Sequence, residues 1–351
     1  MRHDLSSIHP KYSLSDPVAN PKPPYLLFLG EARESADIKT AGGIHYWRPE
    51  LCAGQLRLPG ARLKLPLPEM SPARAASSGV RSLLIGTVTA GGIFPQSWRG
   101  IFLEALRCGL DIVNGLHQRL DFDPELASAA RENGCRLIEL RDPGRSFDIG
   151  RGEPRSGKRI LTVGTDCNVG KMYTALAVER ELKERNKHAA FRATGQTGIL
   201  IAGGGVPLDA VVSDFVSGAT EYLSPAAPDN HWDVIEGQGS LHHPAYAGVT
   251  LGLIHGAQPD WLIVCHDPMR ADMRHAPGYP VPDLGVATSS ALDAARLTNP
   301  EVRCAGFSLN TSRLGEDEAA ELLTAVSEAF GLPAVDPVRT SIAPLVDRIL
   351  Y

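Results

Sequence analysis

The residues with the clearest chemistry form a glycine-bounded loop in the middle of the chain. Gly164, Gly170 and Lys171 meet the spacing G-x-x-x-x-G-K. An apolar, strand-like run at 160–163 enters this loop, and a helix-forming run at 174–184 leaves it. This is the context of a phosphate-binding P-loop, in which backbone N–H groups and a helix N-terminus surround phosphate oxygens. We therefore predict that the loop binds a phosphorylated ligand, with Lys171 as its cation.

The position after the P-loop lysine normally carries a Ser or Thr hydroxyl that binds Mg²⁺. Here that residue is Met172, Tyr173 follows it, and Thr174 could take the role only if the register shifted by two residues. The motif therefore favours phosphate binding over Mg-dependent ATP hydrolysis. The residues that we predict to bind the cofactor are Thr165, Asp166, Cys167, Asn168, Val169, Gly170, Lys171, Met172 and Tyr173.

Two carboxylates near this motif are candidates for acid–base chemistry. Asp166 lies inside the loop, where a carboxylate beside phosphate is costly unless a cation or an amine needs it. Glu236 follows an apolar strand and precedes Gly-x-Gly, so it could bind a metal, hold a substrate ammonium or act as general base. Its alternative role is structural, accepting hydrogen bonds from loop N–H groups. We take Asp166, Lys171 and Glu236 as the candidate catalytic residues.

Further polar residues lie at or soon after the ends of predicted strands, and such ends share one edge of a parallel sheet. An arginine fork suits a carboxylate ligand, although each arginine could equally form a structural ion pair. A histidine beside Glu236 could move a proton or lie on the surface. The predicted substrate-binding residues are Arg192, Gln196, Gln238, His242 and Arg270.

No metal site is expected from the sequence. It has no H-x-x-x-H pair, and its cysteines lack C-x-x-C spacing, which indicates reduced thiols rather than a zinc site or a disulfide framework. Cys167 lies in the P-loop itself, where a helix N-terminus could activate it, but a spacer role is favoured. The cysteines are Cys52, Cys108, Cys135, Cys167, Cys265 and Cys304.

The alternation of strand and helix patterns predicts two α/β domains with parallel sheets. The predicted boundaries are an extended Pro-rich arm at 1–23, a first domain at 24–142, a Gly/Pro-rich linker at 143–158 and a second domain at 159–351. In the first domain we predict strands at 25–30, 82–87, 111–115 and 136–140. We interpret residues 40–48 as a loop and 50–80 as irregular. In the second domain we predict strands at 160–163, 189–193, 232–235, 261–266 and 303–310.

The composition favours an ordinary globular protein, and the N-terminal sequence favours one that stays in the cytoplasm. Hydrophobic residues make up 43% of the chain and charged residues 21%, and the formal net charge of -5 argues against nucleic-acid binding. No apolar run is long enough to span a membrane, and the N-terminus lacks a hydrophobic signal core. The Pro-rich arm indicates packing on a neighbouring subunit, so we expect a homo-oligomer.

These motifs, in this order, are similar to those of dethiobiotin-synthetase-like P-loop proteins. More closely, the chain from about Tyr25 to its C-terminus resembles the DgcN family of bacterial proteins, first described as a domain of unknown function. The most specific segments are Gly164-Thr165-Asp166-Cys167-Asn168-Val169-Gly170-Lys171-Met172 and Val234-Ile235-Glu236-Gly237-Gln238-Gly239-Ser240-Leu241.

The resemblance implies a small Rossmann-like N-terminal domain and a P-loop NTPase-like C-terminal domain. It also implies an N-acetyltransferase that uses acetyl-CoA, acts on a D-amino acid with D-glutamate as the expected substrate, and works beside an N-acetyl-amino-acid racemase in D-amino-acid breakdown. Coenzyme A carries phosphates that a P-loop could hold without Mg²⁺.

Two other functions stay open at this point. A Mg-ATP-dependent ligase or kinase-like enzyme of the dethiobiotin synthetase type predicts nucleotide turnover, and Met172 counts against it. A nucleotide-sensing binding protein predicts tight binding without turnover. Polar residues at several strand ends favour an enzyme over a sensor.

Overall fold

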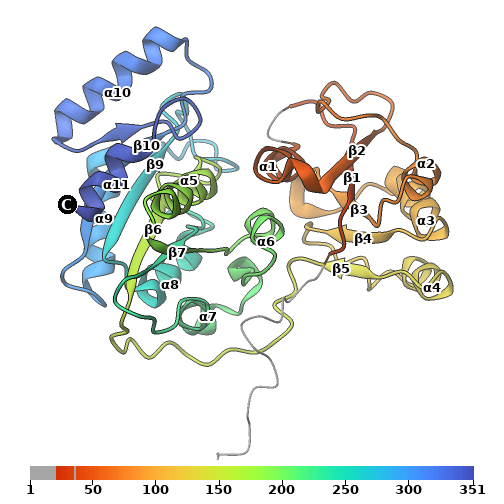
Figure 1. The fold of residues 1–351 in the computed structure, drawn as a ribbon, viewed down its shortest axis with the longest axis horizontal. Coiled ribbons are helices and arrows are strands. Elements are labelled where there is room, and N and C mark those ends of the chain that lie inside the picture. Colours follow the sequence, from red (N-terminus) through yellow and green to blue (C-terminus); the bar gives the residue numbers. More distant parts are fainter. Residues whose placement is uncertain (1–20, 35–36) are drawn as a thin grey trace, which may run out of the picture. The chain divides into compact units, whose positions relative to one another are not determined.

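A computed structural model describes residues 21–34 and 37–351, which form two compact units (Figure 1). Unit 1 contains the described residues up to Gly144 together with Ile199–Gly205, and unit 2 contains Arg145–Gly198 and Val206–Tyr351. The predicted arm at 1–23 lies outside the described residues, except for 21–23. No helix in the described ranges is both long and apolar enough to cross a bilayer.

Unit 1 is built on a parallel five-stranded sheet with the order β2-β1-β3-β4-β5. Four of its strands match the sequence prediction, because each is a short apolar run that the sheet buries on both faces. The strands are β1 (Tyr25–Gly30), β2 (Cys52–Arg57), β3 (Ser82–Ile85), β4 (Asp111–Asn114) and β5 (Leu137–Glu139).

The interpretation of residues 50–80 as irregular is wrong, since they contain β2 and the short helix α2 (Pro72–Ser77). The polar residue Gln55 obscures the strand pattern of β2. Its buried side chain donates to the carbonyls of Leu65 and Leu67, at 2.9 and 2.8 Å, and accepts from the Leu65 amide at 2.8 Å. A buried amide with its hydrogen bonds made is tolerated in a strand, but it breaks the apolar run that identifies one.

The interpretation of residues 40–48 as a loop is also wrong, because helix α1 spans Lys39–Trp47. Gly42 and Gly43 lower its intrinsic helix propensity, but packing against the sheet outweighs that penalty. The contact is close: a Cβ placed on Gly86 would lie 2.5 Å from the Cβ of Ala41. The remaining helices of unit 1 are α3 (Arg99–Arg107) and α4 (Pro124–Glu132).

Unit 2 is built on a parallel six-stranded sheet with the order β11-β10-β9-β6-β8-β7. The five strands predicted for this domain are present, and the two-residue β11 was not predicted. The strands are β6 (Lys158–Gly164), β7 (His188–Arg192), β8 (His231–Ile235), β9 (Trp261–His266), β10 (Arg303–Leu309) and β11 (Ala334–Val335). The P-loop strand β6 is therefore central, between β8 and β9.

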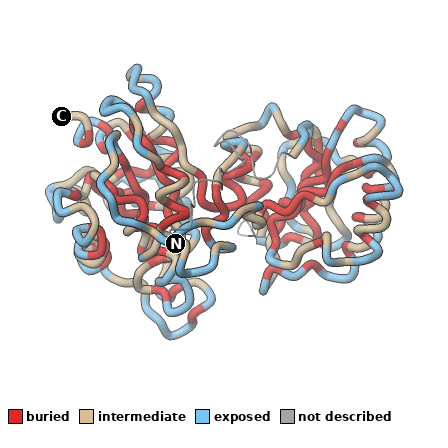
Figure 2. Tube along the Cα trace, turned by 90° about the horizontal axis from the view of Figure 1, so that it is seen from below, coloured by how far each residue is buried: buried red, intermediate tan, exposed pale blue. Residues whose placement is uncertain are grey.

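Helices cover this sheet, and α5 packs with α11 while α8 packs with α9. Figure 2 shows buried segments of the chain in the interior of each unit and exposed segments at its surface. The helices are α5 (Lys171–Glu184), α7 (Val216–Leu223), α8 (Ala247–Ala257), α9 (Leu284–Arg296), α10 (Glu316–Phe330) and α11 (Ala343–Leu350). Helix α6 (Gln196–Ala202) begins in unit 2 and continues into the segment Ile199–Gly205 of unit 1.

Most of the segment predicted as a linker, 143–158, packs along α7 within unit 2. The guanidinium of Arg145 lies 3.9 Å from the ring centroid of Tyr222, and the carboxylate of Glu221 accepts from the amides of Arg151 and Gly152. These contacts lead the chain into β6 and so into the P-loop.

Candidate active site

The P-loop lies between β6 and α5, and two glycines shape it. At Gly164 a Cβ would meet Val169 Cγ2 at 2.8 Å and Lys171 Nζ at 3.1 Å, so the loop closes over this residue. Gly170 has a φ of 105°, which L side chains rarely adopt, and it precedes the first residue of α5. The first-turn N–H groups of α5 have no intrahelical acceptor and carry the positive end of the helix dipole. The loop is therefore built to receive an anion.

Lys171 lies inside this loop and is buried. Its Nζ donates to the carbonyl oxygen of Asp166 at 2.8 Å. Burial lowers the pKa of Lys171, because the surrounding protein disfavours the charged ammonium. An anionic ligand would restore the charged form, which makes Lys171 suited to binding phosphate or carboxylate.

Asp166 ties the loop to the segment that follows β9. Its Oδ1 accepts from the amide of Cys167 at 2.6 Å, and its Oδ2 accepts from Arg270 Nη1 at 2.6 Å and from the amide of Arg274 at 2.7 Å. The residue is fully buried, so these bonds replace its hydration. Both oxygens are engaged, and the geometry favours a positioning role for Asp166 over proton transfer.

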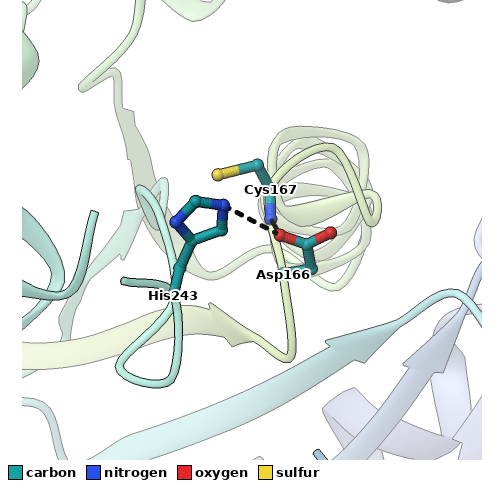
Figure 3. Close-up of side chains that lie close together, drawn as sticks. All are labelled: Asp166, Cys167 and His243. Carbon is teal, nitrogen blue, oxygen red and sulfur yellow. Dashed lines mark hydrogen bonds and ion pairs between the residues drawn. The ribbon is translucent and has the colours of Figure 1, made fainter. Parts of the chain in front are cut away.

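Asp166, Cys167 and His243 lie close together, with one metal-ligand atom of each within 4.8 Å of the others (Figure 3). His243 Nδ1 accepts from the amide of Ala245 at 3.1 Å, and Nε2 donates to the carbonyl of Arg274 at 2.8 Å. This pattern assigns the ring hydrogen to Nε2, so both nitrogens serve the fold. The trio locks the P-loop against residue 274 and offers a metal no open histidine lone pair.

Glu236 follows β8 and organises the chain after β7. Its Oε2 accepts from the amides of Thr194 and Gly195, at 3.0 and 3.2 Å. A Cβ on Gly198 would lie 2.3 Å from Oε2, so glycine is needed at that position to leave room for the carboxylate. The structural alternative stated for Glu236 therefore accounts for the contacts of one of its oxygens.

Glycine is also required where Gly237 crosses the P-loop strand. A Cβ there would lie 1.7 Å from the carbonyl oxygen of Thr162 and 2.9 Å from Lys171 Cδ. The amide of Gly237 donates to Thr162 Oγ1 at 3.0 Å. This close approach sets the Glu236 carboxyl group beside the loop.

The side chains that would serve Mg²⁺ in a nucleotide hydrolase are engaged in other contacts. Thr174 Oγ1 donates to the Gly170 carbonyl at 3.0 Å and contacts Ser308 Oγ at 2.7 Å, and the residue is fully buried. Asp267, which follows β9, accepts from Arg313 Nη2 at 2.7 Å and from Arg270 Nη2 at 3.3 Å. Thr174 therefore does not replace the hydroxyl that Met172 lacks, which argues against the Mg-ATP alternative.

The predicted substrate-binding residues do not form one group. Arg192 Nε donates to Asp233 at 2.7 Å, in a buried network that includes His231 and Ser224. Arg270 lies on the P-loop, where its Nη1 also donates to the Cys167 carbonyl at 2.6 Å. The structure thus gives both arginines ion pairs, one on the sheet and one at the loop.

The three other candidates lie near Glu236 or the P-loop. Gln238 Nε2 donates to Thr194 Oγ1 at 3.0 Å, and Gln196 is buried at the start of α6. His242 lines a small cavity beside Gly164. Its Nε2 is buried and has no hydrogen-bond partner among the described residues, so it is available to a ligand.

Sequence reasoning missed the contributions of Thr194 and Arg274 to this site, and it considered His243 only as one of two histidines that could move a proton. Arg274 contributes backbone groups, which any residue type could supply, so the sequence carries no signal for it. Thr194 contributes its amide and also a hydroxyl that donates to the Glu236 carbonyl and accepts from Gln238, and a hydroxyl residue directly after a predicted strand is the signal that could have found it. Thr165 Oγ1 and His266 Nδ1 form a hydrogen bond of 2.9 Å, which ties the P-loop to the end of β9.

Comparison with known proteins places the chain in a family. Residues 148–346 match the model of the DUF1611 P-loop domain, and residues 57–143 match the Rossmann-like DUF1611_N domain, both described as domains of unknown function. A DUF1611 family protein from Anabaena variabilis has a similar crystal structure, with a TM-score of 0.84 and 30% identity over 94% of this chain and 99% of that one.

Two curated relatives align over nearly their full lengths. The D-glutamate N-acetyltransferase of Tritonibacter scottomollicae is 49% identical over 93% of this chain and 98% of its own. The D-glutamate N-acetyltransferase of a Pseudoalteromonas species is 46% identical over 93% of this chain and 99% of its own. These matches confirm the resemblance inferred from the motifs and the predicted pairing of a Rossmann-like with a P-loop domain, and the chain belongs to the DUF1611 family.

Proposed function

We propose that this protein is an N-acetyltransferase that moves the acetyl group of acetyl-CoA to the amino group of D-glutamate. The observation that carries the proposal is the near full-length similarity to two proteins named D-glutamate N-acetyltransferase. The site supports it, because its P-loop is shaped for an anion while the hydroxyl that would bind Mg²⁺ is absent at Met172. Coenzyme A supplies such anions in its pyrophosphate and 3′-phosphate.

In the proposed reaction the amine nitrogen attacks the thioester carbonyl carbon, and the carbon–sulfur bond breaks. The amine must first lose its ammonium proton to a base, and a second proton leaves the nitrogen as the amide forms. The departing thiolate of coenzyme A takes up one proton. Donors aimed at the carbonyl oxygen would stabilise the negative charge that develops there.

The length of acetyl-CoA determines which roles Lys171 and Glu236 can have together. About thirteen bonds separate the pyrophosphate from the thioester, which corresponds to roughly four extended residues or about 15 Å. Lys171 and Glu236 lie at the same end of the site, since Gly237 abuts Lys171. If the loop holds the phosphates, Lys171 binds the donor and Glu236 shapes the pocket. If it holds the thioester, Glu236 is the base and the loop amides form the oxyanion hole.

Glu236→Gln distinguishes these roles, because an amide keeps the shape of the side chain but cannot accept the proton. A large fall in kcat with an unchanged Kd for coenzyme A would assign Glu236 as base. An unchanged kcat would remove it from the chemistry. Asp166 is the weaker candidate for base because both its oxygens are already bonded.

The test of the overall function is a thiol-release assay with acetyl-CoA, a panel of D- and L-amino acids, and EDTA. We expect coenzyme A to be released with D-glutamate and the release to be unaffected by EDTA. The proposal would be refuted if no amine caused release of coenzyme A and the protein turned over ATP in a Mg-dependent reaction. The family resemblance also leads us to propose a cytoplasmic homo-oligomer that works beside an N-acetyl-amino-acid racemase, which size measurement and co-expression tests can check.

A further inference from the structure

The carboxyl edge of the unit 1 sheet gathers positive charge at a defined topological position. The strand order β2-β1-β3-β4-β5 is that of a doubly wound sheet in which the connections change direction between β1 and β3. In such sheets ligands bind outside the carboxyl ends of the strands at this switch point. Nothing in the P-loop chemistry described above uses this edge.

Hydrogen bonds and close packing bring together the loops that follow four different strands of this sheet. The amide of Val88, after β3, donates to the carbonyl of Asp37 at 2.7 Å, just before α1 begins. The turn at Gly92 packs on His117, after β4, and the Gln118 amide donates to the Gly92 carbonyl at 2.9 Å. Arg141, after β5, donates from Nε to the Gly115 carbonyl at 2.8 Å.

Three of the residues in these loops can carry positive charge: Lys39 at the first turn of α1, His117 and Arg141. They lie near enough to interact, since the charges of Arg141 and Lys39 add to burial in lowering the pKa of His117. The backbone adds to this field, because α1 has no acidic residue in its first turn and its N-terminus points the positive end of its dipole here.

Three carboxylates of the same edge have other partners. Glu31 accepts from Trp98 Nε1 at 2.7 Å, and Asp37 accepts from the amides of Arg33 and Glu34, at 2.9 and 3.0 Å. Glu139 accepts from Asn114 Nδ2 at 2.6 Å and from the Leu120 amide at 2.7 Å, and burial raises its pKa. These contacts hold the acidic groups in their own loops.

Two glycines shape the backbone beside these three cationic residues. Gly91 and Gly92 have φ values of 70° and 67°, so their peptide groups turn in a way that side-chain-bearing residues rarely adopt. A Cβ on Gly92 would lie 2.6 Å from His117 Cδ2, so only glycine leaves the imidazole in place. The Gly92 amide donates to the Thr89 carbonyl at 3.0 Å, so the turn contributes to the site by holding His117 in place.

We propose that unit 1 binds a small anionic group, a carboxylate or a phosphate, at the β1/β3 switch point through Lys39, His117 and Arg141. The proposed site is built from residues of unit 1 and does not depend on acetyl transfer. It supplies a second set of cations to a protein whose proposed substrate carries two carboxylates and whose proposed donor carries several phosphates.

The experiment is a titration of the full chain, labelled with ¹⁵N-histidine, with inorganic phosphate in one arm and with glutarate in the other. The His117 resonance is assigned by its loss in His117→Gln. We expect it to shift and saturate, with a half-saturation concentration unchanged in Lys171→Met, which impairs the P-loop. The arm with the lower half-saturation concentration identifies the source of the anion as phosphoryl or carboxylate.

Lys39→Gln and Arg141→Gln should each raise that concentration about tenfold, the loss expected for one charge-assisted hydrogen bond. Lys39 is exposed, so its variant will fold even if Arg141→Gln does not. The matched control is Arg107→Gln, an exposed residue in the last turn of α3. The proposal would be overturned if the His117 resonance did not shift in either arm. It would also be overturned if Arg107→Gln raised the half-saturation concentration as much as the other two variants, or if Lys171→Met raised it.

Discussion

The two units present the same edge of the same kind of sheet in different ways. In unit 2 one continuous loop between β6 and α5 carries the cation, and buried contacts from Asp166 to Arg270 and Arg274 fix it. In unit 1 the charges lie on separate loops after different strands, and Lys39 and His117 are exposed. A continuous, buried motif is preorganised before a ligand arrives, whereas the geometry of a site assembled from separate loops depends on how each loop packs.

This comparison predicts that substitutions at the P-loop edge cost more stability than equivalent ones at the unit 1 edge. The largest effect is expected for Asp166→Ala. It removes a fully buried carboxylate and leaves Arg270 without its main partner, so the free energy of unfolding should fall by about 3 kcal/mol in urea titrations. The control is Asp293→Ala, which breaks an exposed ion pair with Arg296 and should change little. Equal effects of the two variants would contradict a buried anchor at Asp166.

The next effect is steric and belongs to Gly237. An added Cβ would overlap the Thr162 carbonyl, which is backbone and cannot turn away, so Gly237→Ala should cost about 2–3 kcal/mol and weaken coenzyme A binding. Gly248→Ala, at a helical glycine of α8 with nothing within 4 Å, should be neutral or slightly stabilising. Thermal unfolding of the two variants side by side measures the difference. A stable, fully binding Gly237→Ala would show that β6 and β8 are not held this closely.

Lys171→Met separates binding from stability. Losing the cation should weaken coenzyme A binding by about 2 kcal/mol, or roughly 30-fold by calorimetry. Because burial lowers the pKa of Lys171 from its ordinary value of 10.5, the unfolded chain binds more protons than the folded one between those two pKa values. The free energy of unfolding therefore rises with pH across that window and is lowest below it.

The Met variant should lose this pH dependence and should be more stable than the wild type below the lowered pKa of Lys171. Urea titrations of both proteins across alkaline pH test the sign. A wild-type stability that falls with pH in that window, with no difference from the variant, would mean that Lys171 is not held in a buried site.

The smallest effect is expected in unit 1, for Gly92→Ala. Its positive φ costs an L-residue about 1 kcal/mol, and the new Cβ would lie 2.6 Å from His117 Cδ2 and 2.8 Å from the His117 backbone nitrogen, a milder overlap than the 1.7 Å met at Gly237. The His117 resonance should move and its response to anions weaken, while coenzyme A binding stays unchanged. Gly100→Ala, in α3 with nothing within 4 Å, is the control. If Gly92→Ala lowered the free energy of unfolding as much as Gly237→Ala does, the contrast between the two sheet edges would be contradicted.

The amino-acid sequence by itself determined the P-loop, the two parallel α/β domains and the family. Spacing of Gly164, Gly170 and Lys171 is local, and buried parallel strands are apolar runs, so both features are visible along the chain. Local patterns gave the wrong prediction for two elements. The glycines of α1 are tolerated because the helix packs against the end of β3, and the buried Gln55 of β2 finds its hydrogen-bond partners in a later loop.

Only the tertiary structure decided what the polar residues contact. Arg192 and Arg270 are equivalent in sequence terms, yet one pairs with Asp233 on the sheet and the other with Asp166 at the P-loop. Asp166 and Glu236 are both candidate bases by sequence, and only the location of their partners, which are mostly backbone amides, makes Glu236 the stronger of the two. A hydrogen bond to a backbone group leaves no trace in residue type, and the convergence of Lys39, His117 and Arg141 depends on sheet order. Residue spacing therefore reveals a site carried by one continuous loop, whereas the fold alone assembles one from separate strands.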